Sequence, residues 1–376
     1  MKRKMLLIPL VLLLIASLVA CAAPAPAPAP AVPGPPGPPG PPGLPAPAPA
    51  PAPAPAEPLF WRMHTHLAIG RPEVTAIERF CTQVKIDTNG MIDISLFPGA
   101  ALGYKGEEVA DVVQSGLLEM GELALPWIAG GHPILDLLQL PFLISGDMQA
   151  PPKAFAAAKP YVEKDLAERD LVMIFYGPGG TFSYLCSKEP CNTVAEWDGT
   201  KFRAWSAAQT KWFPWLGCTP VSMSSGEQYM ALQTGAIEGV IQGPASTINR
   251  KVYEVCDYYN LWGSDPPCPY IIVMKKSMLE ALPQNYQDII WKRADELTET
   301  LWQVSHFEVS YRGIEAPAGL DEVREVMTVL DVSPEEDAKM KAIVTPYWDD
   351  WLEEAGAEGL EALNAVLVAQ GLEPYK

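Results

Sequence analysis

Arg203 is the residue whose type and position best suit binding chemistry, and it lies near the end of a short predicted strand, residues 201–204. A guanidinium stays charged at any physiological pH, and its planar fork matches the two oxygens of a carboxylate. In a cleft that excludes water, such a pair becomes stronger. A surface arginine in an ordinary salt bridge fits the same spacing. Arg203 is therefore a candidate anion-binding residue, with a surface ion pair as the alternative.

Side chains close to Arg203 in the sequence are candidates for the same site. Trp205 and Ser206 follow it directly, as a candidate wall and a candidate hydrogen-bond donor. Trp127 comes from an earlier part of the chain and is a candidate lid. Packing competes with both tryptophan assignments, because large aromatic side chains usually bury their area in a core.

Two histidines, His64 and His66, stand two residues apart on a predicted strand and could face the same side. Two histidines without a third ligand make a poor metal site. We therefore expect them to be packed or solvated, and we expect no bound metal.

The sequence contains no GxSxG elbow, P-loop, HExxH or dinucleotide fingerprint. Carboxylate side chains are plentiful, yet none falls into a recognisable acid/base arrangement. We therefore expect neither a cofactor nor an enzymatic activity. A secreted, lipid-anchored enzyme that acts on a small carboxylate is the alternative.

Residues 197–244 contain the elements that must position Arg203. They are predicted as strand, helix, strand, helix and strand, with Arg203 on the first strand, 201–204. Ser224 and Glu227 have the spacing of a capping box, in which each side chain satisfies the backbone N–H of the other. Gly235 is placed to end that helix in a left-handed conformation. The last strand, 237–241, ends at the Gly243-Pro244 step.

The rest of the body follows the same alternation. Further strands are predicted at 62–67, 91–97, 117–123, 171–176 and 271–274, and helices from about Pro72 to Asn89-Gly90, over 106–114 and over 149–169. This order implies a largely parallel sheet with helices on both faces. Residues 177–180 are predicted to cross between domains. A long helix from Pro283 carries one apolar stripe, and Ser333 with Glu336 predicts the start of a terminal helix.

The N-terminus has the pattern of an export signal, residues 1–20. A basic start precedes an apolar run that is marginal for a membrane span of about 20 residues. The sequence Leu18-Val19-Ala20-Cys21 resembles the bacterial lipobox, in which the cysteine becomes the lipidated N-terminus. We expect a lipid on Cys21, with a plain signal peptide or a single membrane anchor as the alternative.

Residues 21–58 are predicted to be a linker, because almost all residues after Cys21 are Ala, Pro or Gly. Alternating Pro and Ala favours an extended, solvated chain. At about 3.1 Å per residue, such a chain could hold the body up to roughly 110 Å from a membrane. Residues 34–43 have glycine at every third position, as in collagen, so a trimeric stalk is an alternative to a spacer. Only a few Gly-Pro-Pro triplets are present, and the flanking Pro-Ala repeat lacks the glycine that a triple helix needs at every third position. A spacer is therefore favoured.

The charge balance is acidic, with 27 Lys and Arg against 45 Asp and Glu. This balance argues against nucleic acid and against adhesion to an anionic lipid surface. Besides Cys21 there are six cysteines, and none forms CxxC. Outside the cytoplasm, Cys186 with Cys191 and Cys256 with Cys268 could each close a small loop, while buried thiols fit equally well.

In the order and spacing of several segments, the body resembles the solute-binding lipoproteins of tripartite ATP-independent periplasmic (TRAP) transporters. The segments are FCTQVKIDTNGMIDISLFPGAALGYKGEEVADVVQSGLLEMGE at 80–122, LPF at 140–142, WDGTKFR at 197–203, Leu216-Gly217, and EQYMALQTGAIEG at 227–239. The match extends over most of residues 59–371. Each fragment is weak alone, but their order and spacing together are specific.

The resemblance implies a two-domain α/β periplasmic-binding-protein fold, type II-like, with hinge strands, a long connecting helix and a ligand cleft between the domains. Domain I would be 59–180 plus part of 270–376, and domain II 181–270 plus part of 280–376. Arg203 would be the family's carboxylate-binding arginine. The lipid-anchored protein would capture a small organic acid outside the cytoplasm. It would deliver the acid to a membrane permease of a small and a large subunit, driven by an ion gradient.

Three positions of the implied site depart from the family's sugar-acid members. Ser183 stands where those members place a second arginine, Gln242 where an asparagine is expected, and Ser225 where an aromatic residue is expected. The Gly243-Pro244 step is more similar to the branch that binds 2-oxo or 2-hydroxy monocarboxylates. That branch can use a metal held by an acidic residue near Gly239, and no such acid is present here.

Overall fold

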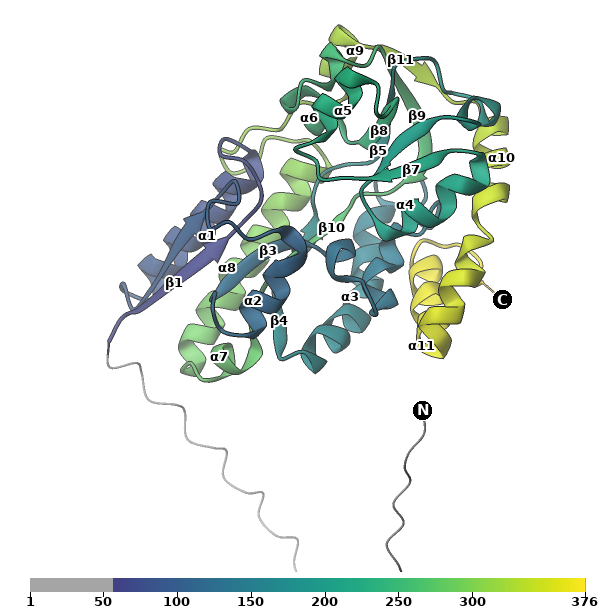
Figure 1. The fold of residues 1–376 in the computed structure, drawn as a ribbon. Coiled ribbons are helices and arrows are strands. Elements are labelled where there is room, and N and C mark those ends of the chain that lie inside the picture. The colour runs from purple at the N-terminus through teal and green to yellow at the C-terminus, as the bar shows by residue number, and fades with distance from the viewer. Residues whose placement is uncertain (1–56, 376) are drawn as a thin grey trace, which may run out of the picture. The chain divides into compact units, whose positions relative to one another are not determined.

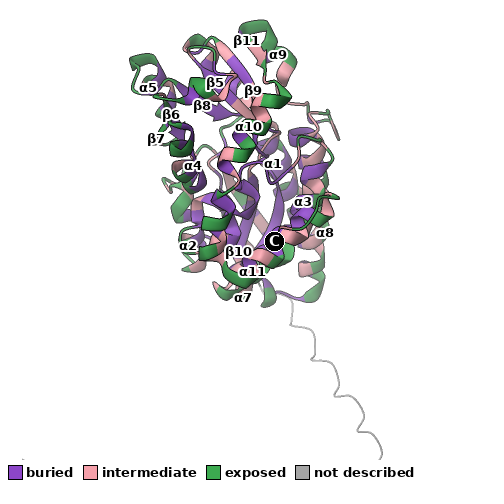
Figure 2. Cartoon of the chain, turned by 90° about the vertical axis from the view of Figure 1, so that its right-hand side faces the viewer, coloured by how far each residue is buried: buried purple, intermediate pink, exposed green. Residues whose placement is uncertain are grey.

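The computed structural model describes residues 57–375, whose strands form two mixed sheets surrounded by helices (Figure 1). The predicted export signal, Cys21 and nearly all of the predicted linker lie outside the described residues. No helix among residues 57–375 combines the length and apolarity needed to cross a membrane. Buried residues gather on the strands and on the inner sides of the helices (Figure 2).

The first sheet has five strands, and one of them runs against its neighbours. Its order is β2 (Ile92–Phe97), β1 (Leu59–His64), β3 (Met120–Ala124), β10 (Pro269–Lys275) and β4 (Leu171–Pro178). β1 is parallel to β2 and to β3, whereas β10 is antiparallel to both β3 and β4. Four of the five strands run in one direction, so the prediction of a largely parallel sheet is confirmed, and β10 is the exception because it returns from the second sheet and lies between β3 and β4.

The second sheet has six strands and carries Arg203. Its order is β11 (Thr328–Asp331), β9 (Tyr258–Asp265), β5 (Ser183–Ser187), β8 (Gly239–Gln242), β6 (Lys201–Ala204) and β7 (Thr219–Ser222). β6 is parallel to β7 and β8, while β5 is antiparallel to β8 and β9. The carboxyl ends of β6, β7 and β8 therefore meet at one edge of the sheet.

Eleven α-helices of the described chain cover these sheets. They are α1 (Pro72–Asp87), α2 (Val109–Gln114), α3 (Ala150–Glu168), α4 (Ala207–Trp212), α5 (Gln228–Thr234), α6 (Pro244–Asn249), α7 (Lys276–Glu280), α8 (Gln284–Leu301), α9 (Leu320–Val326), α10 (Pro334–Val344) and α11 (Tyr347–Ala369). The predicted apolar stripe of the long helix is confirmed, since Ile290, Ala294, Leu297, Leu301 and Val304 are all buried.

Several predicted boundaries are wrong by a few residues. The first strand is Leu59–His64 rather than 62–67, because its register against Ile92–Phe97 starts at Leu59. The third strand begins only at Met120, after the exposed Leu117. Gly235 ends α5 in the predicted left-handed conformation, with φ 77°.

The predicted capping box at Ser224 forms differently. The Glu227 carboxylate accepts hydrogen bonds from the Ser224 backbone N at 2.9 Å and from its Oγ at 2.7 Å. The serine hydroxyl therefore donates instead of capping, and α5 begins later, at Gln228. Ser333, in contrast, caps α10 as predicted, accepting from the Glu336 backbone N at 3.2 Å.

The chain passes between the two sheets three times: the third passage, from β10 to β11, runs through the long helix α8, and the first two lie side by side. Residues 179–182 lead from β4 to β5, and residues 266–268 lead from β9 to β10. The Gly179 backbone N donates to the Cys268 carbonyl at 2.8 Å, so a hydrogen bond ties the crossings together. A Cβ at Gly179 would lie 2.7 Å from the Tyr270 ring, so only glycine fits here without displacement. The predicted crossing at 177–180 lies at the first of these places, while the two-domain division stays a prediction.

An aromatic cluster anchors the strand that carries Arg203. The fully buried Trp197 ring lies 5.2 Å from Phe202, 6.1 Å from Trp212, 5.6 Å from Phe213 and 6.0 Å from Trp262, centroid to centroid. Three of these contacts are edge-to-face, a geometry that adds to the energy of burial. Phe202 immediately precedes Arg203, so the cluster fixes the backbone from which the guanidinium extends.

The six cysteines of the described chain are free thiols. Five of them are buried and Cys268 is partly buried. Of the two alternatives left open by the sequence, this arrangement agrees with buried thiols. Burial also raises the pKa of Cys81 to about 12 and of Cys186 to about 12, which keeps both thiols protonated.

Candidate functional site

Arg203 is a buried cation on β6 and is 9 % exposed. Its Nε donates to the Met223 carbonyl at 3.1 Å, and its Nη1 donates to Gln228 Oε1 at 3.1 Å. Neither partner carries a charge, and no ion pair of the described chain includes Arg203. Burial, reinforced by the neighbouring Arg250, lowers the pKa of Arg203 to about 10. A buried guanidinium without a counter-charge favours the approach of an anion.

Two glutamines hold the guanidinium in place. Gln228 Nε2 donates to Gln242 Oε1 at 2.8 Å, and Gln242 Nε2 donates to Thr247 Oγ1 at 3.3 Å. The Tyr259 hydroxyl donates to the Gln242 carbonyl at 3.0 Å. All of these side chains are buried. The predicted residues Arg203 and Gln242 thus belong to one hydrogen-bond chain, joined by Gln228, which the sequence did not single out.

A second arginine, Arg250, lies close to Arg203. It follows α6, and its Nη1 donates to the Ser225 carbonyl at 3.2 Å. Burial lowers the pKa of Arg250, and Arg71 lowers it further. Ser225 therefore contributes to this region through its backbone carbonyl. The position of α6 directly after β8 could have indicated Arg250, because the ends of β6 and β8 share one edge of the sheet.

The first sheet faces these arginines with a polar and aromatic cluster built around Tyr270 on β10. The Tyr270 hydroxyl lies 3.4 Å from His66 Nε2, and His66 Nδ1 lies 2.8 Å from Glu122 Oε2. The same carboxylate oxygen accepts from Thr65 Oγ1 at 2.8 Å. The Trp127 ring packs edge-on against His66, with 4.6 Å between centroids, and lies 6.2 Å from Tyr270.

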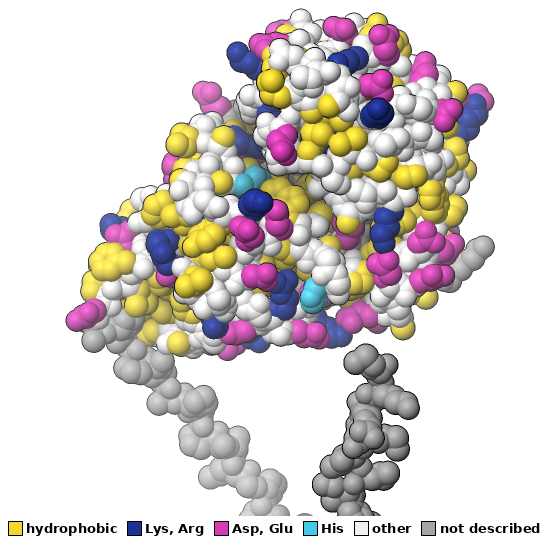
Figure 3. Space-filling model, viewed as in Figure 1, with side chains coloured by type: hydrophobic (Ala, Val, Ile, Leu, Met, Phe, Trp, Pro, Cys, Tyr) yellow, Lys and Arg dark blue, Asp and Glu magenta, His cyan; other side chains and the backbone are white. Residues whose placement is uncertain are grey.

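Tyr270 lies near charges from both sheets. Its hydroxyl interacts electrostatically with Arg203 and Arg250 of the second sheet, and with Arg71 and Glu122 of the first. Burial raises the pKa of Tyr270, so the hydroxyl stays protonated. Figure 3 shows a hollow between the upper part of the molecule, which carries the second sheet, and the lower part, with histidine and basic side chains at its margin.

Arg71, at the start of α1, differs from the other two arginines because it has a carboxylate partner. Its Nε and Nη2 donate to the two oxygens of Glu73, each at 3.0 Å. Burial alone would lower the pKa of Arg71, but the adjacent Glu73 outweighs it and raises that pKa. The Arg71–Glu73 pair is therefore neutral as a unit.

The remaining predicted residues lie around this region without a hydrogen bond to Arg203 in the described chain. Trp205 is partly buried, and its backbone N donates to Gln209 Oε1 at 3.0 Å. Ser206 caps α4, its Oγ accepting from the Gln209 backbone N at 3.2 Å. Ser183 is partly buried on β5 and pairs with Asp265 of β9.

The two histidines of the first strand region have different surroundings. His64 is fully buried, and neither of its ring nitrogens has a hydrogen-bond partner among residues 57–375. Burial lowers the pKa of His64, which keeps the ring neutral. His66 belongs to the Glu122 cluster instead. In this part of the chain, no three His, Cys, Asp or Glu side chains are arranged to hold a metal ion.

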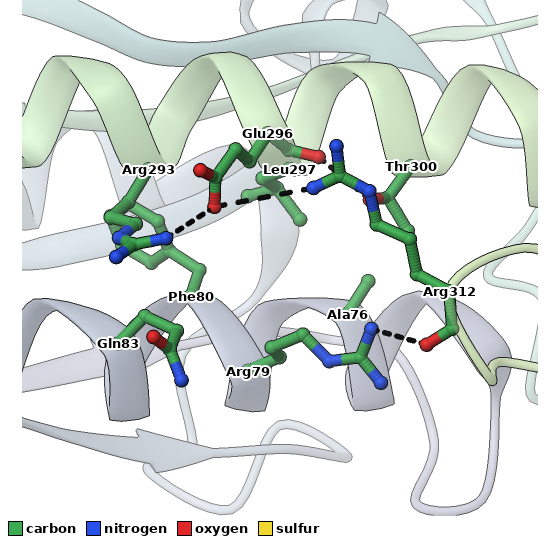
Figure 4. Close-up of a pocket in the computed structure, with 9 residues that line it drawn as sticks. All are labelled: Ala76, Arg79, Phe80, Gln83, Arg293, Glu296, Leu297, Thr300 and Arg312. Atoms are coloured by element: carbon green, nitrogen blue, oxygen red, sulfur yellow. Dashed lines mark hydrogen bonds and ion pairs between the residues drawn. The ribbon is translucent and has the colours of Figure 1, made fainter.

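A separate hollow lies between α1 and α8 (Figure 4). Arg79, Arg293 and Arg312 line it, and Arg293 and Arg312 form ion pairs there with Glu296 and Glu299. Arg293 Nη1 donates to Glu296 at 2.6 Å, and Arg79 Nη1 donates to the Arg312 carbonyl at 2.6 Å. The Arg203 region is the better candidate for anion binding, because Arg203 and Arg250 are desolvated by burial and have no ion-pair partner in the described chain.

Comparison with known proteins adds a family match. Residues 63–355 match the model of the family described as DctP, bacterial extracellular solute-binding protein, family 7. The C4-dicarboxylate-binding periplasmic protein DctP of Rhodobacter capsulatus is 25% identical over 319 residues, which is 82% of this chain and 91% of that protein.

Solved structures agree with the fold. A marine metagenome TRAP solute-binding protein specific for pyroglutamate has 27% identity and a TM-score of 0.74, covering 82% of this chain and 99% of that chain. The Bordetella pertussis extracytoplasmic solute receptor DctP7, which binds pyroglutamic acid, has a TM-score of 0.74 at 22% identity, with 82% and 99% covered. The two-sheet α/β architecture is thus that of TRAP solute receptors.

Proposed function

This chain belongs to the bacterial extracellular solute-binding protein family 7, and from that premise we propose that it captures a small organic acid and passes it to a TRAP permease. One observation carries the proposal for the ligand: Arg203 is a buried cation with no carboxylate partner in the described chain. A ligand carboxylate supplies the missing counter-charge. The pyroglutamate and C4-dicarboxylate specificities of the relatives are consistent with such a ligand.

The ligand carboxylate would bind at the second sheet. Arg203 has one terminal nitrogen, Nη2, without a hydrogen-bond partner among residues 57–375, while Nε and Nη1 are held by Met223 and Gln228. The two glutamines keep the guanidinium pointing in one direction, so little orientational freedom is lost on binding. Trp205, Ser206, Ser183 and Trp127 remain proposed wall and contact residues.

Closure would bring the first sheet onto the bound acid. We assign domain I to 59–180 plus part of 270–376 and domain II to 181–270 plus part of 280–376, with the two paired crossings as the hinge. Exclusion of water on closure strengthens the arginine–carboxylate pair. The permease, with a small and a large membrane subunit, would recognise the closed form.

The first test is a thermal-shift screen of the body, from about Glu57 onward, against small mono- and dicarboxylates. An acid at a hundred times its dissociation constant is expected to stabilise the folded protein by roughly 2.7 kcal/mol. Mass spectrometry of the same mixtures should show the acid unchanged. Conversion of the acid would support an enzyme instead, and the absence of any stabilising acid would count against the proposed function.

The lipid anchor is tested separately, at Cys21. This residue lies outside the described residues, and the proposal rests on its lipobox-like context. In a bacterial host that processes lipoproteins, Cys21→Ser is expected to move the protein from the membrane fraction to the soluble fraction, because no thiol remains to receive the lipid. Ligand stabilisation should be unchanged. A protein that stays with the membrane would mean that its apolar N-terminus, and not a lipid, holds it there.

A further inference from the structure

We propose that Glu122 accepts a hydrogen bond from an N–H or O–H group of the ligand, so that the site selects a monocarboxylate bearing such a donor over a dicarboxylate. This inference rests on the proposed function and concerns the end of the ligand opposite Arg203. It makes Glu122 a specificity-determining residue that the sequence did not reveal.

The Glu122 carboxylate is buried, and only one of its oxygens is used within the described chain. The residue is 1 % exposed, and its Oε2 receives Thr65 Oγ1 and lies against His66 Nδ1. Its Oε1 is buried and has no hydrogen-bond partner among residues 57–375. A buried polar atom left without a partner is costly, so a group that supplies a donor there gains the corresponding free energy.

Packing fixes the position of this carboxylate relative to the arginines. The Trp127 ring packs against one side of His66. A Cβ at Gly106 would lie 2.1 Å from the Trp127 ring, so the Gly106 backbone is in direct contact with this ring. His66 links Glu122 to the Tyr270 hydroxyl, which lies near Arg203 and Arg250. The arginines Arg203 and Arg250 and the Glu122 carboxylate thus lie around the same residue, Tyr270.

The charges of these groups favour an acid with one negative charge. Arg203 and Arg250 carry one positive charge each without an ion-pair partner in the described chain, while the Arg71–Glu73 pair is neutral as a unit. One ligand carboxylate pairs with Arg203, whereas a second carboxylate at the other end of the ligand would lie beside the Glu122 carboxylate and be repelled.

Hydrogen-bond chemistry acts in the same direction. A carboxylate accepts hydrogen bonds and cannot donate one. A dicarboxylate would therefore leave Glu122 Oε1 unpaired in addition to the repulsion. A ligand with a lactam N–H or a 2-hydroxyl beside its single carboxylate satisfies both ends of the site.

Matched ligand pairs test this inference by calorimetry or thermal shift. The probes are L-pyroglutamate with its lactone analogue, in which O replaces N–H, and L-lactate with propionate, with succinate as the dicarboxylate. For at least one pair, we expect the donor-bearing member to bind at least 10-fold more tightly than its partner and than succinate. Glu122→Gln should reduce that ratio below about 3-fold and strengthen succinate binding.

Glu119→Gln is the matched control, because Glu119 lies on the loop entering the same strand and its carboxylate pairs with Arg62 at the surface. Glu119→Gln should leave every affinity ratio unchanged.

Glu122→Asp provides a second variant if the Glu122→Gln protein does not fold. It keeps the charge that excludes succinate but shortens the reach of the carboxylate to the ligand donor. The preference for the donor-bearing ligand should therefore fall, while succinate binding stays weak.

The outcomes separate this inference from the proposed function. A wild-type protein that prefers succinate, or a donor preference that Glu122→Gln leaves intact, overturns the role of Glu122 while capture of an acid still stands. Binding of other acids from the screen, with none of the four paired probes bound, also overturns the inferred ligand class. Failure of every acid to bind overturns the proposed function itself.

Discussion

Arg203→Ala is expected to weaken binding of the captured acid by about 30-fold or more. Removal of one partner from a buried, hydrogen-bonded charge pair typically costs 2–5 kcal/mol, because the other charge is left without compensation. Arg250 does not replace Arg203, since its Nη1 is directed to the Ser225 carbonyl. Thermal shift with the best acid of the screen should show stabilisation of the wild type and almost none of the variant.

Two further substitutions at the same position separate charge from shape. Arg203→Lys keeps the charge but lacks the planar fork, so intermediate affinity is expected. Arg203→Met removes the charge at similar length, and its ligand-free melting temperature should match or exceed that of the wild type, because the native guanidinium is buried without a counter-charge. An alanine variant that binds as tightly as the wild type would show that the anchor lies elsewhere.

The second large effect is expected for stability, at Trp197. This ring is fully buried at the centre of four aromatic side chains that hold the strand carrying Arg203. Trp197→Ala should lower the free energy of unfolding by about 3–5 kcal/mol, the usual cost of emptying a large aromatic site in a core. The shift in the midpoint of denaturant unfolding, at unchanged slope, measures this loss.

Trp197→Phe is the conservative comparison. The Trp197 Nε1 has no hydrogen-bond partner in the described chain, so phenylalanine removes volume without breaking a hydrogen bond. A clearly smaller loss is therefore expected. Trp215, which is 38 % exposed, offers a tryptophan outside the core, and Trp215→Ala should cost about 1 kcal/mol or less. Equal losses at both tryptophans would contradict the anchoring role of the cluster.

Local signals in the sequence predicted much of the second sheet. Gly235 and Ser333 mark helix ends and starts through backbone chemistry that acts within four residues, and both predictions are confirmed. The predicted alternation of strands and helices from Lys201 to Gln242 is also confirmed. Each of these elements is short, so local sequence signals suffice to predict it. The first strand was placed too late because its register is set by a partner strand distant in sequence.

On the side of the candidate site opposite Arg203, the sequence offered only Trp127 as a contact residue. Tyr270, His66 and Glu122 come from three separate parts of the chain and meet through strand pairing, which spacing alone does not encode. The antiparallel direction of β10 was hidden for the same reason, because it depends on where the chain returns from the second sheet. Arg250 was accessible to sequence reasoning through its position after β8, yet it carries no distinctive motif.

The order in which the strands of the two sheets follow one another in the sequence also affects the folding rate of this chain. β4 pairs with β10 alone, and β10 follows β5 to β9 in the sequence, so the first sheet remains incomplete until those strands have been synthesised. Pairing between such distant segments makes folding slow, since a long loop must close before any contact compensates for it. Slow folding would suit the export signal expected at residues 1–20, because it lengthens the interval in which the polypeptide is still unfolded and able to thread through a secretion channel.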